Sequence, residues 1–135
     1  MAKNRVLIVE DEVSIAKMIA MNLRVAGYDT TIFHNGKEAA EAIEENHDYE
    51  IALLDVMLPG MDGFALFKVV DSYGIPAIFL TARDDIDSKI QGLQGGAEDY
   101  IVKPFEILEL MVRMEKVLER SKKLSDSIRV LDVEI

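Results

Sequence analysis

The chain has 135 residues, enough for one domain with a full hydrophobic core and too few for two large ones. Hydrophobic residues make up 50% of it and only three residues are proline, which excludes a disordered or low-complexity chain. Lys and Arg number 15 against 25 Asp and Glu, a net charge of -10, so we do not expect this acidic segment to bind nucleic acid itself.

The sequence contains no cysteine, which excludes disulfides, zinc–cysteine sites and thiol chemistry. Its longest strongly apolar runs, residues 6–9 and 75–80, are far shorter than a membrane span. Residues 1–5 lead directly into a strand-like run and not into the apolar core of a signal peptide. We therefore expect no membrane association and a cytoplasmic location.

Short aliphatic or β-branched runs alternate with segments of helical spacing along the whole chain. The first predicted strand, residues 5–9, precedes a helix that ends at Gly27 and whose inward positions are Ile15, Met18, Ile19, Asn22 and Leu23. Further strands are predicted over 29–33, 51–54, 77–80 and 100–102. Further helices are predicted over 36–45, from near Gly63, over 86–94, and around Leu110, Met111, Met114, Val117 and Leu118. This alternation predicts a parallel sheet with helices on both faces.

Polar residues stand where the predicted strands end. Glu10 and Asp11 follow the first strand, Asp55 the third, Thr81 the fourth and Lys103 the fifth. Each residue alone has a structural explanation: a helix cap, a partner for loop amides, or a solvated side chain. In a parallel sheet, however, the ligand site lies outside the carboxyl ends of the strands. We therefore expect these five residues to share one pocket.

The residue types in this pocket indicate phosphoryl transfer. Converging carboxylates repel one another unless a cation compensates their charge, and an all-oxygen ligand set favours Mg²⁺. Lys103 can pair with Asp55 and with a phosphoryl oxygen, and Thr81 can donate its hydroxyl to another oxygen. A nucleophilic carboxylate, a divalent metal, a lysine and a hydroxyl together are suited to transfer of a phosphoryl group onto aspartate.

Residues 4–120 resemble the receiver domain of response regulators, of the OmpR/PhoB type, in two-component signal transduction. Four motifs carry the resemblance: VLIVEDE at 6–12, LLDVMLPGMDG at 53–63, FLTAR at 79–83 and GAEDYIVKPF at 96–105. The resemblance implies a flavodoxin-like (βα)5 three-layer sandwich, with a five-stranded parallel sheet in the order 2-1-3-4-5. It also implies a cis peptide before Pro104.

The resemblance assigns roles to the strand-end residues. Asp55 would be the phosphoacceptor, with Thr81 and Lys103 binding the phosphoryl group. Mg²⁺, for which Mn²⁺ or Ca²⁺ could substitute, would be held by Asp11, Asp55 and the backbone carbonyl of Met57, with Glu10 acting through water. Two further roles concern the response: Tyr100 would turn inward as Thr81 moves, and Met57 and Arg83 would tune how long the phosphoaspartate lasts.

The fourth helix, fifth strand and fifth helix carry charges that resemble the dimer face of OmpR/PhoB-type regulators. The residues concerned are Lys89, Glu98, Asp99, Glu109, Arg113 and Arg120. By analogy Lys89 would meet Glu109, and Asp99 would meet Arg113, across a two-fold axis in a homodimer. The alternative is ordinary solvated helix charge, because exposed ion pairs contribute little individually.

The end of the chain has a different pattern. Residues 121–127 are polar, as in a linker, and residues 128–135 alternate apolar and polar, as in a strand. They resemble the opening strand of a winged-helix DNA-binding domain. We therefore divide the chain into a receiver domain, 1–121, and a linker with the first strand of a truncated effector domain, 122–135. The alternative is a natural C-terminal tail.

The expected protein is a signalling domain and not an enzyme in the usual sense. Its partners would be a sensor histidine kinase, a second copy of itself, and DNA only through a domain that this chain lacks. One alternative is a free-standing receiver that signals by binding a protein. Another is a phosphatase with an aspartyl-phosphate intermediate, but that class needs a carboxylate two residues after the nucleophile, where this chain has Met57.

Overall fold

The computed structural model describes residues 4–82 and 96–134, with side chains as far as Ser121. The strands are β1 (Arg5–Val9), β2 (Asp29–Phe33), β3 (Ile51–Asp55), β4 (Ala77–Ala82) and β5 (Asp99–Lys103). The helices are α1 (Val13–Val25), α2 (Gly36–Glu45), α3 (Gly63–Ser72) and α5 (Ile107–Glu134). The helix predicted over 86–94, with Lys89, lies outside the described residues, as does Arg83.

The five strands form one parallel sheet in the order β2-β1-β3-β4-β5, which confirms the predicted topology. Every residue of β3, and every residue of β1 after Arg5, is buried. Aliphatic runs of this kind suit central parallel strands, because helices cover both of their faces. The edge strands β2 and β5 are mostly half-buried.

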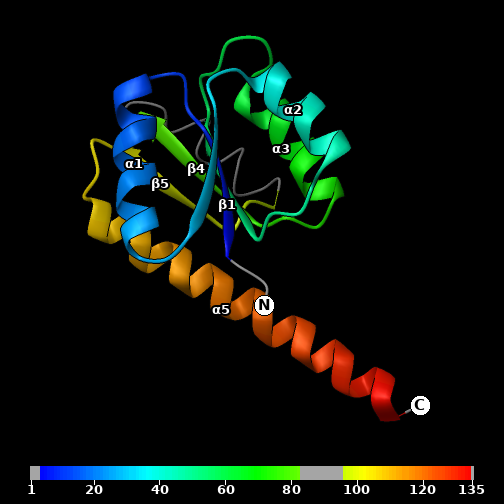
Figure 1. The fold of residues 1–135 in the computed structure, drawn as a ribbon. Coiled ribbons are helices and arrows are strands. Elements are labelled where there is room, and N and C mark those ends of the chain that lie inside the picture. Colours follow the sequence, from blue (N-terminus) through cyan, green and yellow to red (C-terminus); the bar gives the residue numbers. More distant parts are fainter. Residues whose placement is uncertain (1–3, 83–95, 135) are drawn as a thin grey trace.

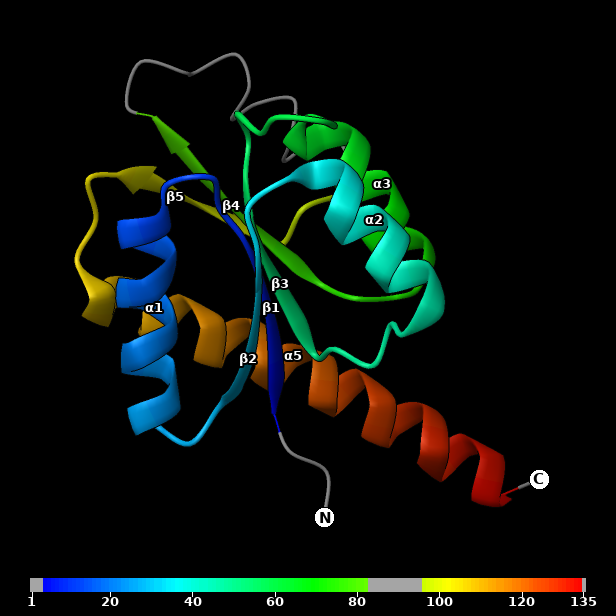
Figure 2. The same ribbon diagram turned by 45° about the horizontal axis from the view of Figure 1, so that its top comes forward.

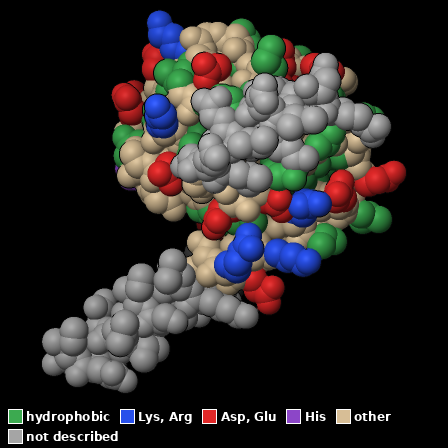
Figure 3. All heavy atoms as spheres, turned by 180° about the vertical axis from the view of Figure 1, so that it is seen from behind, with side chains coloured by type: hydrophobic (Ala, Val, Ile, Leu, Met, Phe, Trp, Pro, Cys, Tyr) green, Lys and Arg blue, Asp and Glu red, His purple; other side chains and the backbone are tan. Residues whose placement is uncertain are grey.

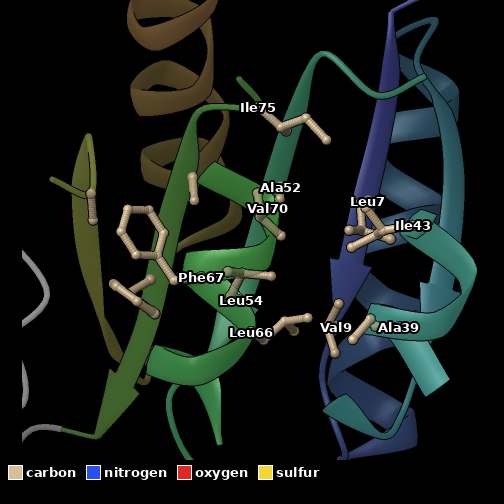
Figure 4. Packing of buried hydrophobic residues seen from close by; sticks show 14 of the residues in the cluster. Leu7, Val9, Ala39, Ile43, Ala52, Leu54, Leu66, Phe67, Val70 and Ile75 are labelled. Atoms are coloured by element: carbon tan, nitrogen blue, oxygen red, sulfur yellow. The ribbon is translucent and has the colours of Figure 1, made fainter. Parts of the chain in front are cut away.

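The helices cover both faces of the sheet, as Figures 1 and 2 show. On one face, α2 and α3 pack against residues of β1, β3 and β4; Figure 4 shows Leu7, Val9 and Leu54 meeting Ile43 and Leu66 there. On the other face, α1 and α5 bury a second cluster of aliphatic side chains. The result is a three-layer sandwich whose strands all end at the same edge.

Helix α1 buries a different stripe from the predicted one. Ile19 and Leu23 are fully buried as expected, but their buried neighbours are Ala16 and Ala20, while Met18 is 36% exposed. The buried positions therefore follow i, i+3, i+4 and i+7 spacing, one face of a helix. Small alanines permit α1 to lie close to the sheet, which leaves the longer methionine at the margin.

The end of the chain differs from the predicted strand. The backbone of α5 is helical to Glu134, including residues 121–127, predicted as a linker, and residues 128–134, predicted as a strand. An extended segment is stable only when another strand pairs with it, and helix α5 continues instead through local hydrogen bonds. Although α5 has 28 residues, none of the helices in the described part of the chain is long and apolar enough to cross a membrane.

Candidate functional site

Three carboxylates meet where β1 and β3 end. Each of Glu10, Asp11 and Asp55 can place one oxygen within 4.8 Å of the others. Glu10 and Asp55 are buried, with residue exposures of 0% and 5%, and Asp11 is exposed. The parallel pairing of β1 with β3, which aligns Val9 with Leu54, accounts for this meeting, since Glu10 and Asp55 directly follow those two residues.

Lys103, at the end of β5, reaches both buried carboxylates. Its Nζ lies 2.6 Å from Oε1 of Glu10 and 3.2 Å from Oδ2 of Asp55. Backbone amides contact the remaining oxygens: Glu12 N donates to Oε2 of Glu10, and Met57 N donates to Oδ1 of Asp55. The contact of Oε1 with Lys103 is an ion pair without well-aligned hydrogen-bond geometry, and no described residue donates a better one.

Burial changes the protonation of the pocket. It raises the pKa of the Glu10 carboxyl to about 7, against the opposing effect of Lys103 and the Glu12 amide. It also raises the pKa of Asp55, although the charge of Lys103 opposes this. Burial alone would lower the pKa of Lys103, but its contacts with Glu10 and Asp55 outweigh burial and raise it. Lys103 therefore stays charged while the carboxyls hold protons more readily than usual.

These features fit a divalent cation. Three carboxylates face the single ammonium of Lys103, which leaves two negative charges when all are ionised. A hard ion such as Mg²⁺ takes carboxylate oxygens and keeps several waters, which suits a pocket with one exposed carboxylate, Asp11, at its mouth. Oε1 of Glu10 contacts the Lys103 ammonium without an aligned hydrogen bond, so it can still accept a hydrogen bond inside the pocket.

The other strand-end residues lie at the same edge of the sheet. Thr81 is buried near the end of β4, one position beyond Leu80, which pairs with Asp55. Its hydroxyl makes a long hydrogen bond of 3.4 Å to the carbonyl oxygen of Ala82. Tyr100 is half-buried on β5, pairs with Phe79 of β4, and packs against the cluster on the α2–α3 face. The peptide between Lys103 and Pro104 is cis, as the resemblance implied.

The loop after Asp55 packs closely against the start of α3. Asp62 caps α3 by accepting a hydrogen bond from the amide of Ala65, 2.9 Å long. Gly63 N donates to the carbonyl oxygen of Val56, and a β-carbon on Gly63 would collide with the carbonyl oxygen of Asp55. The glycine therefore lets α3 begin directly against the backbone of the pocket.

One residue at this edge was not predicted. His34 follows β2, and its ring Nδ1 lies 2.9 Å from the carbonyl oxygen of Glu10. His34 stands outside the four motifs, so the resemblance gives it no role. The signal that could have found it is its position directly after a predicted strand, like the other pocket residues.

The predicted dimer face is partly described. Asp99 pairs with Arg113 within the chain, at 2.9 and 3.0 Å, and Arg113 also contacts Glu109 at 3.3 Å. Glu98 and Arg120 are exposed, and Lys89 lies outside the described residues. On the face in Figure 3, the coloured Lys and Arg side chains lie among Asp and Glu and form no continuous basic surface. The pairing across a two-fold axis stays a prediction.

Comparison of the sequence with known proteins finds relatives that are transcription regulators. The family profile described as the response regulator receiver domain matches residues 6–115. YkoG of Bacillus subtilis, an uncharacterized transcriptional regulatory protein, is 46% identical over 124 residues, which cover 90% of this chain and 54% of YkoG. The DNA-binding response regulator MtrA of Mycobacterium tuberculosis is 39% identical over 136 residues, covering 98% of this chain and 59% of MtrA. The chain thus spans little more than half of these relatives.

Solved structures show the same likeness. The receiver domain of Francisella response regulator 1452 superposes with a TM-score of 0.79 at 36% identity, covering 88% of this chain and 99% of that one. A CheY-like receiver domain protein from Methanospirillum hungatei superposes with a TM-score of 0.83 at 28% identity, covering 90% and 98%. Both alignments span nearly all of the solved chain and most of this one.

Proposed function

Because the chain belongs to the family of response regulator receiver domains, we propose that Asp55 accepts a phosphoryl group from a sensor histidine kinase. The observation that carries the proposal is the buried Asp55 carboxylate, which lies beside the Lys103 ammonium and the Glu10–Asp11 carboxylates. An ionised carboxylate is already a nucleophile and needs no general base. The work of the pocket is therefore positioning and charge neutralisation.

The proposed cofactor is Mg²⁺, with Mn²⁺ or Ca²⁺ as substitutes. Asp11, Asp55 and the backbone carbonyl of Met57 would hold it, and Glu10 would act through a water molecule. The ion would supply positive charge next to the phosphoryl oxygens and would favour the ionised form of Asp55. The excess of carboxylate over ammonium in the pocket supports this assignment.

The reaction needs only one exchange of bonds. An oxygen of Asp55 attacks phosphorus, the bond from phosphorus to the kinase histidine nitrogen breaks, and the nitrogen keeps the electron pair. Lys103 would shift its contact from the Asp55 oxygen to a phosphoryl oxygen, and the Thr81 hydroxyl would donate to another. The long hydrogen bond that Thr81 makes to Ala82 supports this role, because little is lost when it breaks.

The proposed response to phosphorylation is that ion pairs within one chain are exchanged for ion pairs between two chains. Movement of Thr81 toward the phosphoryl group would free space into which Tyr100 turns. The signal would pass to the face that carries Lys89, Glu98, Asp99, Glu109, Arg113 and Arg120. The pair between Asp99 and Arg113 within one chain would then be exchanged for pairs with a second copy.

The whole protein would be a transcription regulator. Its receiver would be residues 1–121, and residues 122–135 would lead into a DNA-binding effector domain outside the 135 residues. The names of YkoG and MtrA, and the share of their length that this chain covers, support this proposal. The relatives are regulators, so the chemistry of Asp55 would serve signalling and not turnover of a metabolite.

The experiment for this proposal is incubation with Mg²⁺ and acetyl phosphate followed by intact-mass spectrometry. We expect one phosphoryl adduct in the wild type and none in Asp55→Asn, which keeps the size of the side chain but removes the nucleophile. Asp62→Asn is the matched control, because Asp62 caps α3 nearby and has no part in the reaction. A wild type without adduct would contradict the proposal.

A further inference from the structure

Residues 34–36, the sequence His-Asn-Gly that joins β2 to α2, contact two sides of the acidic pocket: the end of β1 and the loop after Asp55. On the β1 side, both backbone groups of Glu10 are held. Glu10 N donates to the carbonyl oxygen of Phe33 at 3.0 Å, and His34 Nδ1 lies 2.9 Å from the carbonyl oxygen of Glu10. A carbonyl oxygen can only accept, so His34 is the donor and its Nδ1 carries a proton.

On the other side, the same segment contacts the loop that follows Asp55. Gly36 N donates to the carbonyl oxygen of Pro59 at 3.0 Å. A β-carbon on Gly36 would collide with the carbonyl oxygen of Met61, and one on Gly60 would collide with the Asn35 side chain. The two loops therefore touch closely, through the backbone at Gly36 and against the Asn35 side chain at Gly60.

The segment is also anchored to helix α2. Oδ1 of Asn35 accepts from the amides of Lys37 and Glu38, at 2.8 and 3.2 Å, and so caps α2. Gly36 is buried and begins the helix, whose buried face continues with Ala39, Ala40 and Ile43 against the sheet. Because α2 is capped by Asn35 and packs on the sheet, it holds His34 and Gly36 in place relative to β1 and β3.

We propose that His34 is a positioning residue for cation binding, which fixes the peptide of Glu10 and, with Asn35 and Gly36, sets its place relative to the loop after Asp55. This inference rests on the proposed function of the pocket. The side chain of His34 acts through the backbone of Glu10 and need not touch the ion. Its Nδ1 donates both as the neutral ring and as imidazolium, so the contact does not depend on charge.

The test is isothermal titration of Mg²⁺ into the whole chain. Partners that orient metal ligands typically change affinity 10–100-fold when removed, and we expect His34→Ala to weaken Mg²⁺ binding by about tenfold. His34→Asn places an amide donor where Nδ1 stood and should restore most of the affinity. His47→Ala is the matched control, because His47 is the other histidine, is also exposed, and stacks on Tyr73 at a ring distance of 4.3 Å.

The outcomes separate the two proposals. A wild type that does not bind Mg²⁺ overturns the proposed function, and the inference with it. A wild type that binds, with His34→Ala unchanged or His34→Asn as weak as His34→Ala, overturns the inference alone. Since His34→Ala could unfold, nitrogen-15 spectra of the wild-type imidazoles at alkaline pH give a second readout. We expect the His34 proton on Nδ1, and a proton on Nε2 alone would overturn the inference.

Discussion

The ammonium nitrogen of Lys103 lies 3.2 Å from Oδ2 of Asp55, although 48 positions separate the two residues in sequence. Their strands are not neighbours, because β4 runs between β3 and β5. The same nitrogen also contacts Glu10, at the end of β1. A lysine from an edge strand therefore pairs with two carboxylates at the ends of the central strands and offsets part of their charge.

This relationship predicts that Lys103 stabilises the metal-free fold. Lys103→Met keeps a long apolar stem but leaves two buried carboxylates without their cation. We expect the free energy of unfolding in urea, at mildly alkaline pH without metal, to fall by about 1–3 kcal/mol. Lys68→Met, at an exposed position of α3, is the matched control and should change it by less than about 0.5 kcal/mol. Equal effects of the two variants would argue against stabilisation by the ion pairs of Lys103 with Glu10 and Asp55.

The raised pKa of Glu10 predicts how metal-free stability depends on pH. The folded protein holds a proton on Glu10 up to about pH 7, whereas the ordinary pKa is 4.5. The folded state thus binds more protons than the unfolded state in this window, and the free energy of unfolding falls as pH rises from 4.5 to about 7. The raised pKa of Asp55 acts in the same direction.

Urea unfolding as a function of pH measures this slope. Glu10→Gln cannot ionise, so the decrease in stability between pH 4.5 and about 7 should be smaller in this variant than in the wild type. Glu12→Gln changes an exposed neighbouring carboxylate and should retain the wild-type slope. Identical slopes in wild type and Glu10→Gln would show that Glu10 is not the group responsible.

Arg113 is predicted to take part in dimerisation. In one chain its guanidinium contacts Asp99 and Glu109, and both carboxylates would have counterparts on a second copy. Beryllofluoride imitates a phosphoryl group, so an activated wild type should sediment as a dimer and activated Arg113→Ala mainly as a monomer. Arg24→Ala removes an arginine of α1, far from this face in sequence, and should leave the dimer intact. A monomeric activated wild type would rule out the proposed dimer.

Sequence periodicity was sufficient to predict the strands. A parallel sheet buried on both faces requires uninterrupted aliphatic runs such as those of β1 and β3. Periodicity also located Glu10, Asp11 and Asp55, since strand ends share one edge. The prediction was wrong where one pattern is compatible with both a strand and a helix. Alternation over residues 128–134 resembled a strand, but the backbone there is helical.

Other features depend on contacts that periodicity does not contain. The motif at residues 53–63 could be recognised in the sequence, but the collision that forbids a β-carbon at Gly63 depends on where the carbonyl of Asp55 lies in space. His34 has no partner nearby in sequence, because Glu10 lies 24 positions away. The pairing of Asp99 with Arg113 within one chain likewise follows from how α5 packs beside β5.

Phosphorylation at Asp55 is tested most directly by locating the phosphoryl group in the sequence. Sodium borohydride reduces an aspartyl phosphate to homoserine, which peptide mass spectrometry can place in the sequence. After treatment with Mg²⁺ and acetyl phosphate, we expect homoserine at position 55 and at no other aspartate. Homoserine at Asp11 or elsewhere, or none at all in a protein that binds Mg²⁺, would contradict it.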